Sequence, residues 1–141
     1  MRTFIHSIFS MKGYIENLEE LTVRNTKFRQ VLYTGKHAQL VLMSLLPGED
    51  IGVETHALDQ FFRFESGQGE AILDGVTHTV TDGFCVVVPA GTEHNIVNTD
   101  KDKALRFYTV YSPPEHKDGV VFATKKEAEA SEEHFDGETT E

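Results

Sequence analysis

Turn residues recur through the middle of this chain and divide it into segments of strand length. Between residues 38 and 111, apolar or alternating runs follow one another through turns that contain glycine, proline or an Asp-Gly pair. Asp74-Gly75 joins two such runs and is typical of a two-residue type I′ hairpin, because both turn positions need a positive φ. The expected strands cover residues 28–34, 38–46, 51–56, 60–65, 70–74, 76–80, 84–88, 94–99 and 104–111. No convincing helix separates them, so the sequence predicts an all-β sandwich, jelly roll or small barrel.

The chain has 141 residues, enough for one domain with a substantial core and too few for two. We expect an N-terminal arm and first strand over residues 1–37, a barrel over 38–112 and an acidic extension over 113–141. The extension carries nine acidic residues against three lysines, which accounts for −6 of the net charge of −10. This acidity argues against nucleic acid and against an anionic membrane as partners.

The extension contains one helix signal. Thr124 followed by Glu127 has capping-box spacing and predicts a short helix, whereas residues 136–141 are expected to be disordered. The expected role of the extension is solubility or packing over the barrel, and a partner-binding role is the alternative.

Nothing in the sequence indicates export or membrane insertion. The opening residues 1–9 are too short and too polar for a secretory signal, and no run approaches the ~20 apolar residues of a membrane span. The single cysteine, Cys85, cannot form an internal disulfide and lies in an apolar run, where we expect a buried, unreactive thiol. We therefore expect a cytoplasmic protein.

Four side chains between residues 54 and 94 carry the donor atoms that a first-row divalent metal binds. Glu54 and His56 are two positions apart in an expected strand, so both side chains leave the same face. Gln60 follows four positions later, and His94 comes just after the turn at residues 89–91. Two imidazoles, one carboxylate and one amide oxygen suit such an ion. We predict a metal site formed by Glu54, His56, Gln60 and His94.

These residues lie in two motifs that resemble those of the cupin superfamily. The first family motif is Gly, five residues, His-x-His, three or four residues, Glu, six residues and Gly, which corresponds here to Gly48, Glu54-Thr55-His56, Gln60 and Gly67. The second is Gly, five residues, Pro-x-Gly, two residues, His, three residues and Asn, which is complete here in Gly83, Pro89, Gly91, His94 and Asn98. The resemblance covers about residues 38–111, and the flanks are similar to small single-domain cupins of the mannose-6-phosphate isomerase-like kind. It implies an all-β cupin jelly-roll barrel of two antiparallel sheets, with a short helical or disordered C-terminal extension.

The chain departs from the first motif at two ligand positions. The leading His is Glu54 and the Glu is Gln60, so the two changes together keep one formal negative charge among the four ligands. We take this as an indication that the site still binds a metal. The alternative is a lost site, in which Glu54 is merely solvated and His56 is an interior hydrogen-bonded residue.

The donor set also bears on which metal binds. No thiolate set is present, which removes the best argument for structural zinc. Two oxygens and two nitrogens suit one six-coordinate Mn, Fe, Ni or Co ion with two positions left for water or substrate, and the oxygen content favours manganese, with iron second and zinc still open. Both imidazoles must be neutral to bind, so affinity should fall below about pH 6.

The resemblance implies a metal-dependent enzyme that acts on a small sugar-like or keto/hydroxy molecule, as an isomerase, lyase or dioxygenase. A non-catalytic metal-dependent sugar-binding or sensor module is the alternative, because no acid or base stands out near the motifs and this fold hosts many chemistries. No catalytic residue and no organic cofactor is assigned. Small cupins commonly pair through edge strands, which predicts a homodimer.

Three residue positions outside the motifs leave alternatives open. Arg106 and Tyr108 share one face of the last expected strand; an inward pair could bind an anionic or hydroxylated ligand, and an outward pair is equally consistent with the pattern. His116 is expected to be a surface or hydrogen-bonded histidine.

Overall fold

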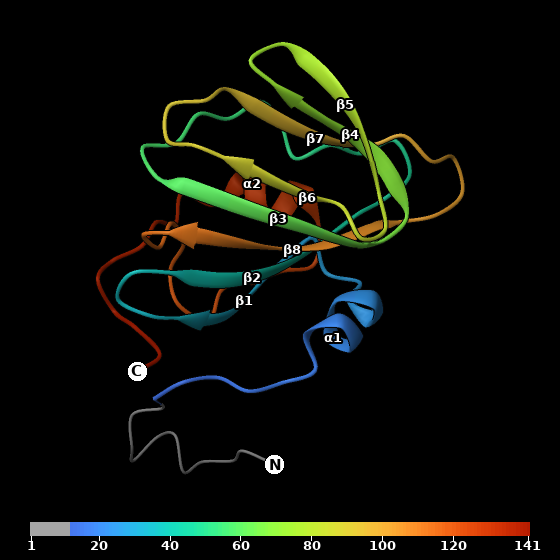
Figure 1. Cartoon of the computed structure of the whole chain (residues 1–141). Helices are drawn as coiled ribbons and strands as arrows, with labels where there is room; N and C mark the ends of the chain where they lie inside the picture. Colours follow the sequence, from blue (N-terminus) through green and yellow to red (C-terminus); the bar gives the residue numbers. More distant parts are fainter. Residues whose placement is uncertain (1–11) are drawn as a thin grey trace.

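The computed structural model describes residues 12–141, so the opening segment 1–9 lies outside the described residues. Nine strands and two short helices follow one another along this part of the chain (Figure 1). Their bounds are α1 (Leu18–Arg24), β1 (Arg29–Thr34), β2 (Gln39–Leu45), β3 (Asp59–Ser66), β4 (Gln68–Leu73), β5 (Val76–Thr81), β6 (Cys85–Val88), β7 (His94–Asn98), β8 (Leu105–Ser112), β9 (Val121–Phe122) and α2 (Lys125–Ala130). Neither helix is long and apolar enough to cross a membrane.

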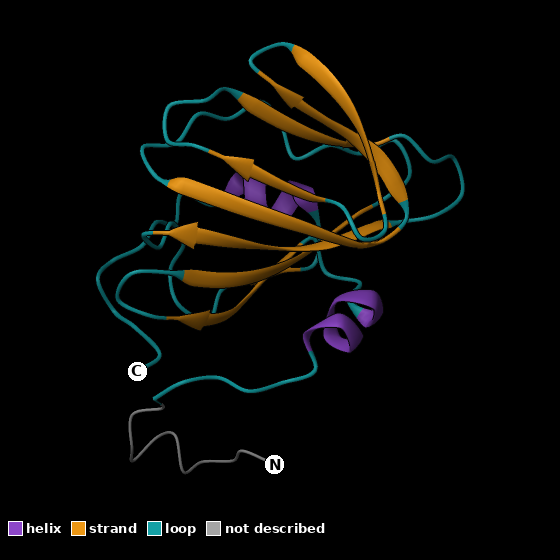
Figure 2. Ribbon diagram, viewed as in Figure 1, coloured by secondary structure: helices purple, strands orange, loops and turns teal. Residues whose placement is uncertain are grey.

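The strands form two antiparallel sheets that face each other (Figure 2). The larger sheet has the order β6-β3-β8-β2-β1-β9 and the smaller has the order β5-β4-β7. Two isolated bridges, Asp50 with Val97 and Glu54 with His94, lay the segment before β3 along the free side of β7. The predicted jelly roll of two antiparallel sheets is confirmed.

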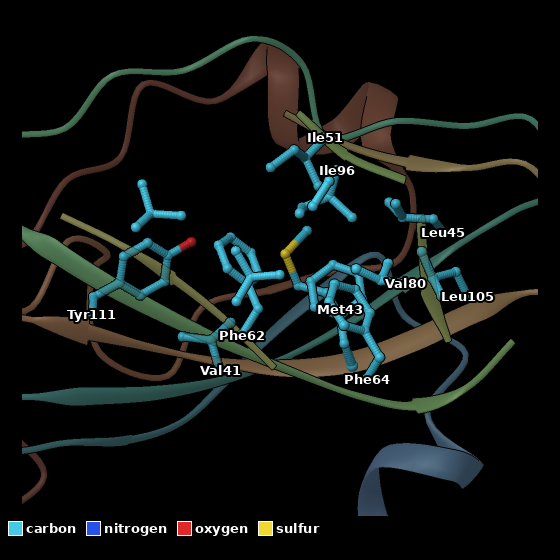
Figure 3. Close-up of a cluster of buried hydrophobic side chains, with 14 of the residues drawn as sticks. Val41, Met43, Leu45, Ile51, Phe62, Phe64, Val80, Ile96, Leu105 and Tyr111 are labelled. Carbon is cyan, nitrogen blue, oxygen red and sulfur yellow. The ribbon is translucent and has the colours of Figure 1, made fainter. Parts of the chain in front are cut away.

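Strand alternation sends large apolar side chains into the space between the sheets. Phe62 and Phe64 of β3, Met43 of β2 and Phe107 of β8 are at most 1% exposed, and burial of each such side chain stabilises the fold by about 1.5–3 kcal/mol. Figure 3 shows Tyr111 at one end of this cluster and Leu45 at the other. The core is therefore continuous from one end of the barrel to the other.

The same alternation decides the orientation of β8. Phe107 and Thr109 are buried, whereas Arg106 and Tyr108 point to the outer face of the larger sheet. There Arg106 donates a hydrogen bond to the carbonyl of Val23 in α1. The outward alternative for Arg106 and Tyr108 is therefore the correct one.

Two expectations about individual segments were wrong. Residues 51–56 do not form a continuous strand, because Gly52 adopts a φ of +95° and only the bridges on either side of it pair with β7. Cys85 is exposed rather than buried. In β6 the inward positions are Val86 and Val88, whereas Cys85 and Val87 are exposed on the outer face of this edge strand.

The β4–β5 hairpin has the predicted turn. Asp74 and Gly75 have φ values of 46° and 82°, which is the type I′ pattern. On the other side of β4, Gly69 lies so close to β7 that an added Cβ would overlap the carbonyl oxygen of Val97. The glycine thus allows the close approach of the strand that carries His94.

The C-terminal extension packs on the barrel. The predicted cap of α2 is confirmed, since Thr124 Oγ1 accepts a hydrogen bond from the Glu127 amide at 3.2 Å. β9 pairs with β1 at the edge of the larger sheet, and Lys125 Nζ then reaches Asp50 Oδ1, at the edge of the smaller sheet, over 2.6 Å. Residues 136–141 are ordered rather than disordered, because the Thr140 amide donates to the Thr34 carbonyl at 2.8 Å.

Candidate metal centre

Three of the four predicted ligands come together at one end of the barrel. Glu54, His56 and His94 each offer one donor atom, and these atoms lie within 4.8 Å of one another. Backbone hydrogen bonds fix the geometry, because the amide of Glu54 donates to the His94 carbonyl and the amide of His94 donates to the Glu54 carbonyl, both at 2.9 Å. The Gly91 amide donates to the His56 carbonyl at 2.8 Å, which fixes the backbone of His56.

His94 has one ring nitrogen prepared for a ligand. Its Nδ1 lies 3.0 Å from the carbonyl oxygen of Thr92. A carbonyl can only accept, so Nδ1 carries the proton and Nε2 carries a lone pair. Nε2 is buried and has no hydrogen-bond partner among the described residues. In metal-binding histidines, one ring nitrogen typically donates its N–H to a backbone carbonyl, which orients the imidazole and leaves the other nitrogen free to bind the metal.

Gln60 presents a second bare donor atom. It is 2% exposed on β3 and pairs in register with Tyr111 of β8. Its Nε2 donates to Thr109 Oγ1 at 2.9 Å, which orients the amide, and its Oε1 is buried without a hydrogen-bond partner among the described residues. Buried carbonyl oxygens are normally satisfied. The role of Gln60 as fourth ligand stays a prediction, and this bare oxygen supports it.

Glu54 and His56 each shift the pKa of the other toward its charged form. His56 Nε2 lies 3.3 Å from Glu54 Oε1, and its Nδ1 lies 3.8 Å from Glu115 Oε2. Burial alone would raise the pKa of Glu54, but the hydrogen bond and charge of His56, with smaller effects of Arg29 and His94, bring it below its ordinary value. The hydrogen bond to Glu54 raises the pKa of His56 against the opposing effect of burial. Where His56 is protonated, a metal must displace that proton to bind.

A hydrogen-bonded chain that the sequence did not indicate starts beside this cluster. His116 Nδ1 lies 2.9 Å from Glu133 Oε2, and His116 Nε2 lies 3.1 Å from the Tyr111 hydroxyl. Because a carboxylate accepts, Nδ1 donates to Glu133. In the neutral imidazole Nε2 then accepts from Tyr111. The Tyr111 ring meets the His56 ring edge-on, with centroids 6.1 Å apart.

Burial and hydrogen bonds determine the protonation states of Tyr111 and Glu133. Burial raises the pKa of Tyr111 well above its ordinary value, so the hydroxyl keeps its proton at neutral pH. Burial also acts to raise the pKa of Glu133, but the hydrogen bonds from His116 and from the Lys117 amide outweigh it and lower that pKa. In the absence of substrate, the hydrogen-bonded group therefore consists of a neutral tyrosine, a histidine and a carboxylate.

Strand alternation could have placed Tyr111 in the interior, since it shares its parity with Phe107. No motif marks His116 or Glu133, which arrive from the extension only through the folding of the chain. His116 is a buried, hydrogen-bonded histidine, which was one of the two expected environments.

Comparisons with known proteins place this architecture among related chains. Residues 41–111, half of the chain, match the family model described as "Cupin domain". The chain is 40% identical over 139 residues to the uncharacterized protein YrkC of Bacillus subtilis (strain 168), covering 94% of this chain and 74% of that protein. It is 43% identical over 112 residues to the uncharacterized protein L612 of Acanthamoeba polyphaga mimivirus, covering 77% and 70% of the two chains. The crystal structure of BH2720 from Bacillus halodurans superposes with a TM-score of 0.82 at 41% identity, covering 85% of this chain and 96% of that one.

Proposed function

The chain belongs to the cupin family, and from this membership and the site we propose that it is a divalent-metal-dependent enzyme acting on a small sugar-like or keto/hydroxy substrate. The observation that carries the proposal is the buried, unpartnered Nε2 of His94, in a residue whose donor atom lies within 4.8 Å of those of Glu54 and His56. Gln60 Oε1 would complete the ligand set. Glu54 is about one-third exposed, which leaves the site accessible to solvent on its side.

The donor set favours manganese, with iron as the second choice, because two oxygens and two imidazole nitrogens suit these ions in six coordination. When bound, the ion would supply a Lewis acid that polarises a carbonyl or hydroxyl oxygen of the substrate. The ligands themselves are held before any ion binds, since the backbone hydrogen bonds of Glu54 and His94 fix their relative position.

The Tyr111 chain supports an enzyme rather than a passive binding module. With His116 neutral, Tyr111 donates its hydroxyl proton to His116 Nε2, and a lone pair of the oxygen can accept a proton from a substrate. As the oxygen accepts that proton, its own proton can pass to His116, and the nearby Glu133 carboxylate stabilises the resulting imidazolium. A proton-transfer residue beside a metal suits an isomerase or lyase better than a dioxygenase.

The metal assignment is tested by metal content. We expect the wild-type protein dialysed against Mn²⁺ to retain about one ion per chain, and His94→Ala and His56→Ala each to lose it while the circular dichroism spectrum stays that of a folded β-protein. His78→Ala is the matched control, because His78 is exposed on β5. Full manganese occupancy in the His94→Ala protein would refute the site.

The catalytic assignment is tested by proton exchange. Dihydroxyacetone in D₂O serves as the probe, and NMR measures the exchange of the hydrogens next to its carbonyl. We expect the manganese-loaded wild-type protein to accelerate this exchange, and Tyr111→Phe to lose at least about 90% of the acceleration, in line with the 10²–10⁴-fold effect of acid–base groups. Unchanged exchange in Tyr111→Phe would remove Tyr111 from catalysis, and no acceleration by the wild-type protein would favour the binding module.

A further inference from the structure

A buried glutamine on β2 holds the start of the C-terminal extension against the barrel. Gln39 is 1% exposed, and its Oε1 accepts hydrogen bonds from the backbone amides of Glu115 and His116 at 3.1 and 2.9 Å. Its Nε2 donates to the His116 carbonyl at 2.7 Å and to Thr34 Oγ1 at 3.0 Å. All the hydrogen-bonding positions of this amide group are therefore used, which fixes the backbone of residues 115 and 116.

The fixed dipeptide places two side chains beside the candidate metal centre. The His116 ring reaches the Tyr111 hydroxyl, whereas the Glu115 carboxylate lies beside the ring of His56. The Glu115 carbonyl also accepts a hydrogen bond from the Phe135 amide at 3.0 Å, so the backbone of Glu115 is held at both its amide and its carbonyl. The position of the Glu115 carboxylate follows from an anchored backbone rather than from a free surface loop.

The two ring nitrogens of His56 face two different carboxylates. Nε2 lies 3.3 Å from Glu54 Oε1, and Nδ1 lies 3.8 Å from Glu115 Oε2. Glu54 and His94 are the residues that cluster with His56, so Nε2 is the nitrogen on the side of the other predicted ligands. A histidine that gives one nitrogen to an ion keeps its proton on the other nitrogen. A carboxylate beside Nδ1 is therefore placed to accept that proton.

The Glu115 carboxylate has no other partner among residues 12–141. Within this part of the chain its hydrogen bonds involve only its backbone, and its one ion pair is with His56. The side chain is 27% exposed, so it is neither tightly packed nor fully solvated. The separation of 3.8 Å from Nδ1 is longer than a hydrogen bond, but such contacts in a ligand-free site commonly tighten when the ligand binds.

We propose that Glu115 is a positioning residue of the metal centre, whose carboxylate accepts the Nδ1 proton of His56 and so leaves Nε2 to the ion. This rests on the proposed function, because the role requires that Glu54, His56 and His94 hold a metal. The same arrangement occurs at His94, where the Thr92 carbonyl lies beside Nδ1 and Nε2 has no partner among the described residues. A carboxylate is a stronger acceptor than a carbonyl and makes the imidazole a better metal ligand. The C-terminal extension thus contributes directly to metal binding.

The affinity for manganese tests this proposal, measured by competition with a fluorescent chelator. We expect Glu115→Ala to bind Mn²⁺ at least about tenfold more weakly than the wild type, the loss typical of residues that orient metal-binding histidines, while its circular dichroism spectrum stays that of a folded β-protein. Glu115→Gln should lose less, because an amide oxygen still accepts the proton but carries no charge. Glu132→Ala is the matched control, since Glu132 is an exposed acid of the same extension. Equal affinities in Glu115→Ala and Glu132→Ala would overturn the proposal.

A second measurement shows whether Glu115 acts through His56. In the protein loaded with Zn²⁺, which is diamagnetic and serves as a probe, we expect the Nδ1 proton of His56 to give a downfield NMR signal that exchanges slowly with water. Glu115→Ala should lose this signal or shift it upfield, and Glu132→Ala should keep it. A role of Glu115 in packing alone would leave the signal unchanged, and that result would exclude a positioning role.

These outcomes separate the role of Glu115 from the proposed function. A wild-type protein that binds neither Mn²⁺ nor Zn²⁺ would overturn both. A wild-type protein that binds metal, together with normal affinity and an unchanged His56 signal in Glu115→Ala, would overturn the role of Glu115 alone. A loss of manganese in Glu115→Ala as complete as that in His94→Ala would make Glu115 a metal ligand, and this too would contradict a positioning role.

Discussion

His94 and Gln60 each have one polar atom satisfied and one left bare. The Thr92 carbonyl orients the His94 ring, and the Thr109 hydroxyl orients the Gln60 amide. In both cases the remaining atom is buried without a hydrogen-bond partner among the described residues. Two bare donors of this kind lower the stability of the metal-free protein, and an ion that binds only the folded state would recover that loss.

The two bare donors should contribute unequally to manganese affinity, so the two alanine variants can be ranked by how much affinity they lose. We expect Gln60→Ala to weaken manganese affinity by about tenfold, some 1.4 kcal/mol, because a neutral amide oxygen is the poorest of the four donors. His94→Ala should weaken it further. Competition with a fluorescent chelator measures both affinities, and Gln30→Ala on the outward side of β1 is the control. A larger loss in Gln60→Ala than in His94→Ala would contradict the ranking.

The Glu54–His56 pair predicts opposite pH effects on the metal-free protein. Folding raises the pKa of His56 above its ordinary 6.5, so the stability it contributes is complete below about pH 6.5 and is lost as the pH rises through the higher folded value. Folding lowers the pKa of Glu54 below 4.5, so its contribution is present above pH 4.5 and is lost as the pH falls through the lower folded value.

Urea unfolding of the metal-free protein at a series of pH values measures both effects. We expect His56→Gln to flatten the decline in unfolding free energy above pH 6.5, and His78→Gln, an exposed control on β5, to leave it unchanged. Since folding raises the pKa of His56, manganese binding should also release protons over the pH range in which the imidazole is protonated. Identical pH profiles for the wild type and His56→Gln would show that the pair does not stabilise the charged imidazole.

At the scale of elements, the site depends on how β7 is held. β7 pairs with β4 on one side and is bridged to residues 50–54 on the other. Gly69 allows this packing, because an added Cβ there would overlap the carbonyl oxygen of Val97 in β7. The turn residue Asp74 accepts a hydrogen bond from the Glu93 amide, just before β7. The position of His94 therefore follows from glycines that have no chemistry of their own.

The β4–β5 turn gives a prediction about stability. Gly75→Ala places a Cβ on a residue with a φ of 82°, and we expect it to lower the free energy of unfolding by about 1 kcal/mol. The urea midpoint of the metal-free protein measures the change, and Thr79→Ala on the exposed face of β5 is the control. A midpoint equal to that of the wild type would mean that the turn relaxes to another type at no cost.

At the scale of the whole molecule, the C-terminal extension is part of the barrel. β9 extends the larger sheet, Lys125 connects α2 to Asp50, which is bridged to β7 of the smaller sheet, and Ala128 packs against the core. The extension also delivers His116 and Glu133 to Tyr111. Packing over the barrel, one of the expected roles of this acidic segment, is therefore what the structure shows.

The opposite edge of the larger sheet is apolar, and we propose that a homodimer forms there. β6 is an edge strand with Val87 59% exposed, and Phe84, just before the strand, is 50% exposed. Beside it lies a groove of about 350 Å³ that Leu73 and Val80 help to line. An apolar edge strand next to such a groove favours pairing with a second copy.

Light scattering tests this proposal. We expect the wild-type protein to have twice the chain mass of 15.9 kDa, and Val87→Lys to shift it to the monomer. Val121→Lys is the matched control, because Val121 is 49% exposed on β9 at the other edge of the same sheet. A monomeric wild type, or a dimer broken only by Val121→Lys, would exclude the β6 edge.

Much of the fold followed from local sequence because its signals are local. A two-residue turn such as Asp74-Gly75 needs positive φ values that few residues adopt, and strand alternation depends only on the backbone pleat. The rule that predicted Glu54 and His56 on one face assumed a strand over residues 51–56 that does not form, although their donor atoms do come together. Local rules did not decide whether Cys85 is covered, because burial depends on which strand becomes an edge. They also missed the break at Gly52.

From the sequence alone, turn spacing indicated an all-β sandwich, jelly roll or small barrel, and the resemblance to the cupin motifs implied the two-sheet barrel and grouped Glu54, His56 and His94. Tertiary structure alone decided what surrounds that cluster. His116 and Glu133 come from the C-terminal extension, which carries no motif. Their position beside Tyr111 depends on the packing of that extension on the barrel, where β9 pairs with β1, a contact that only the folded backbone creates.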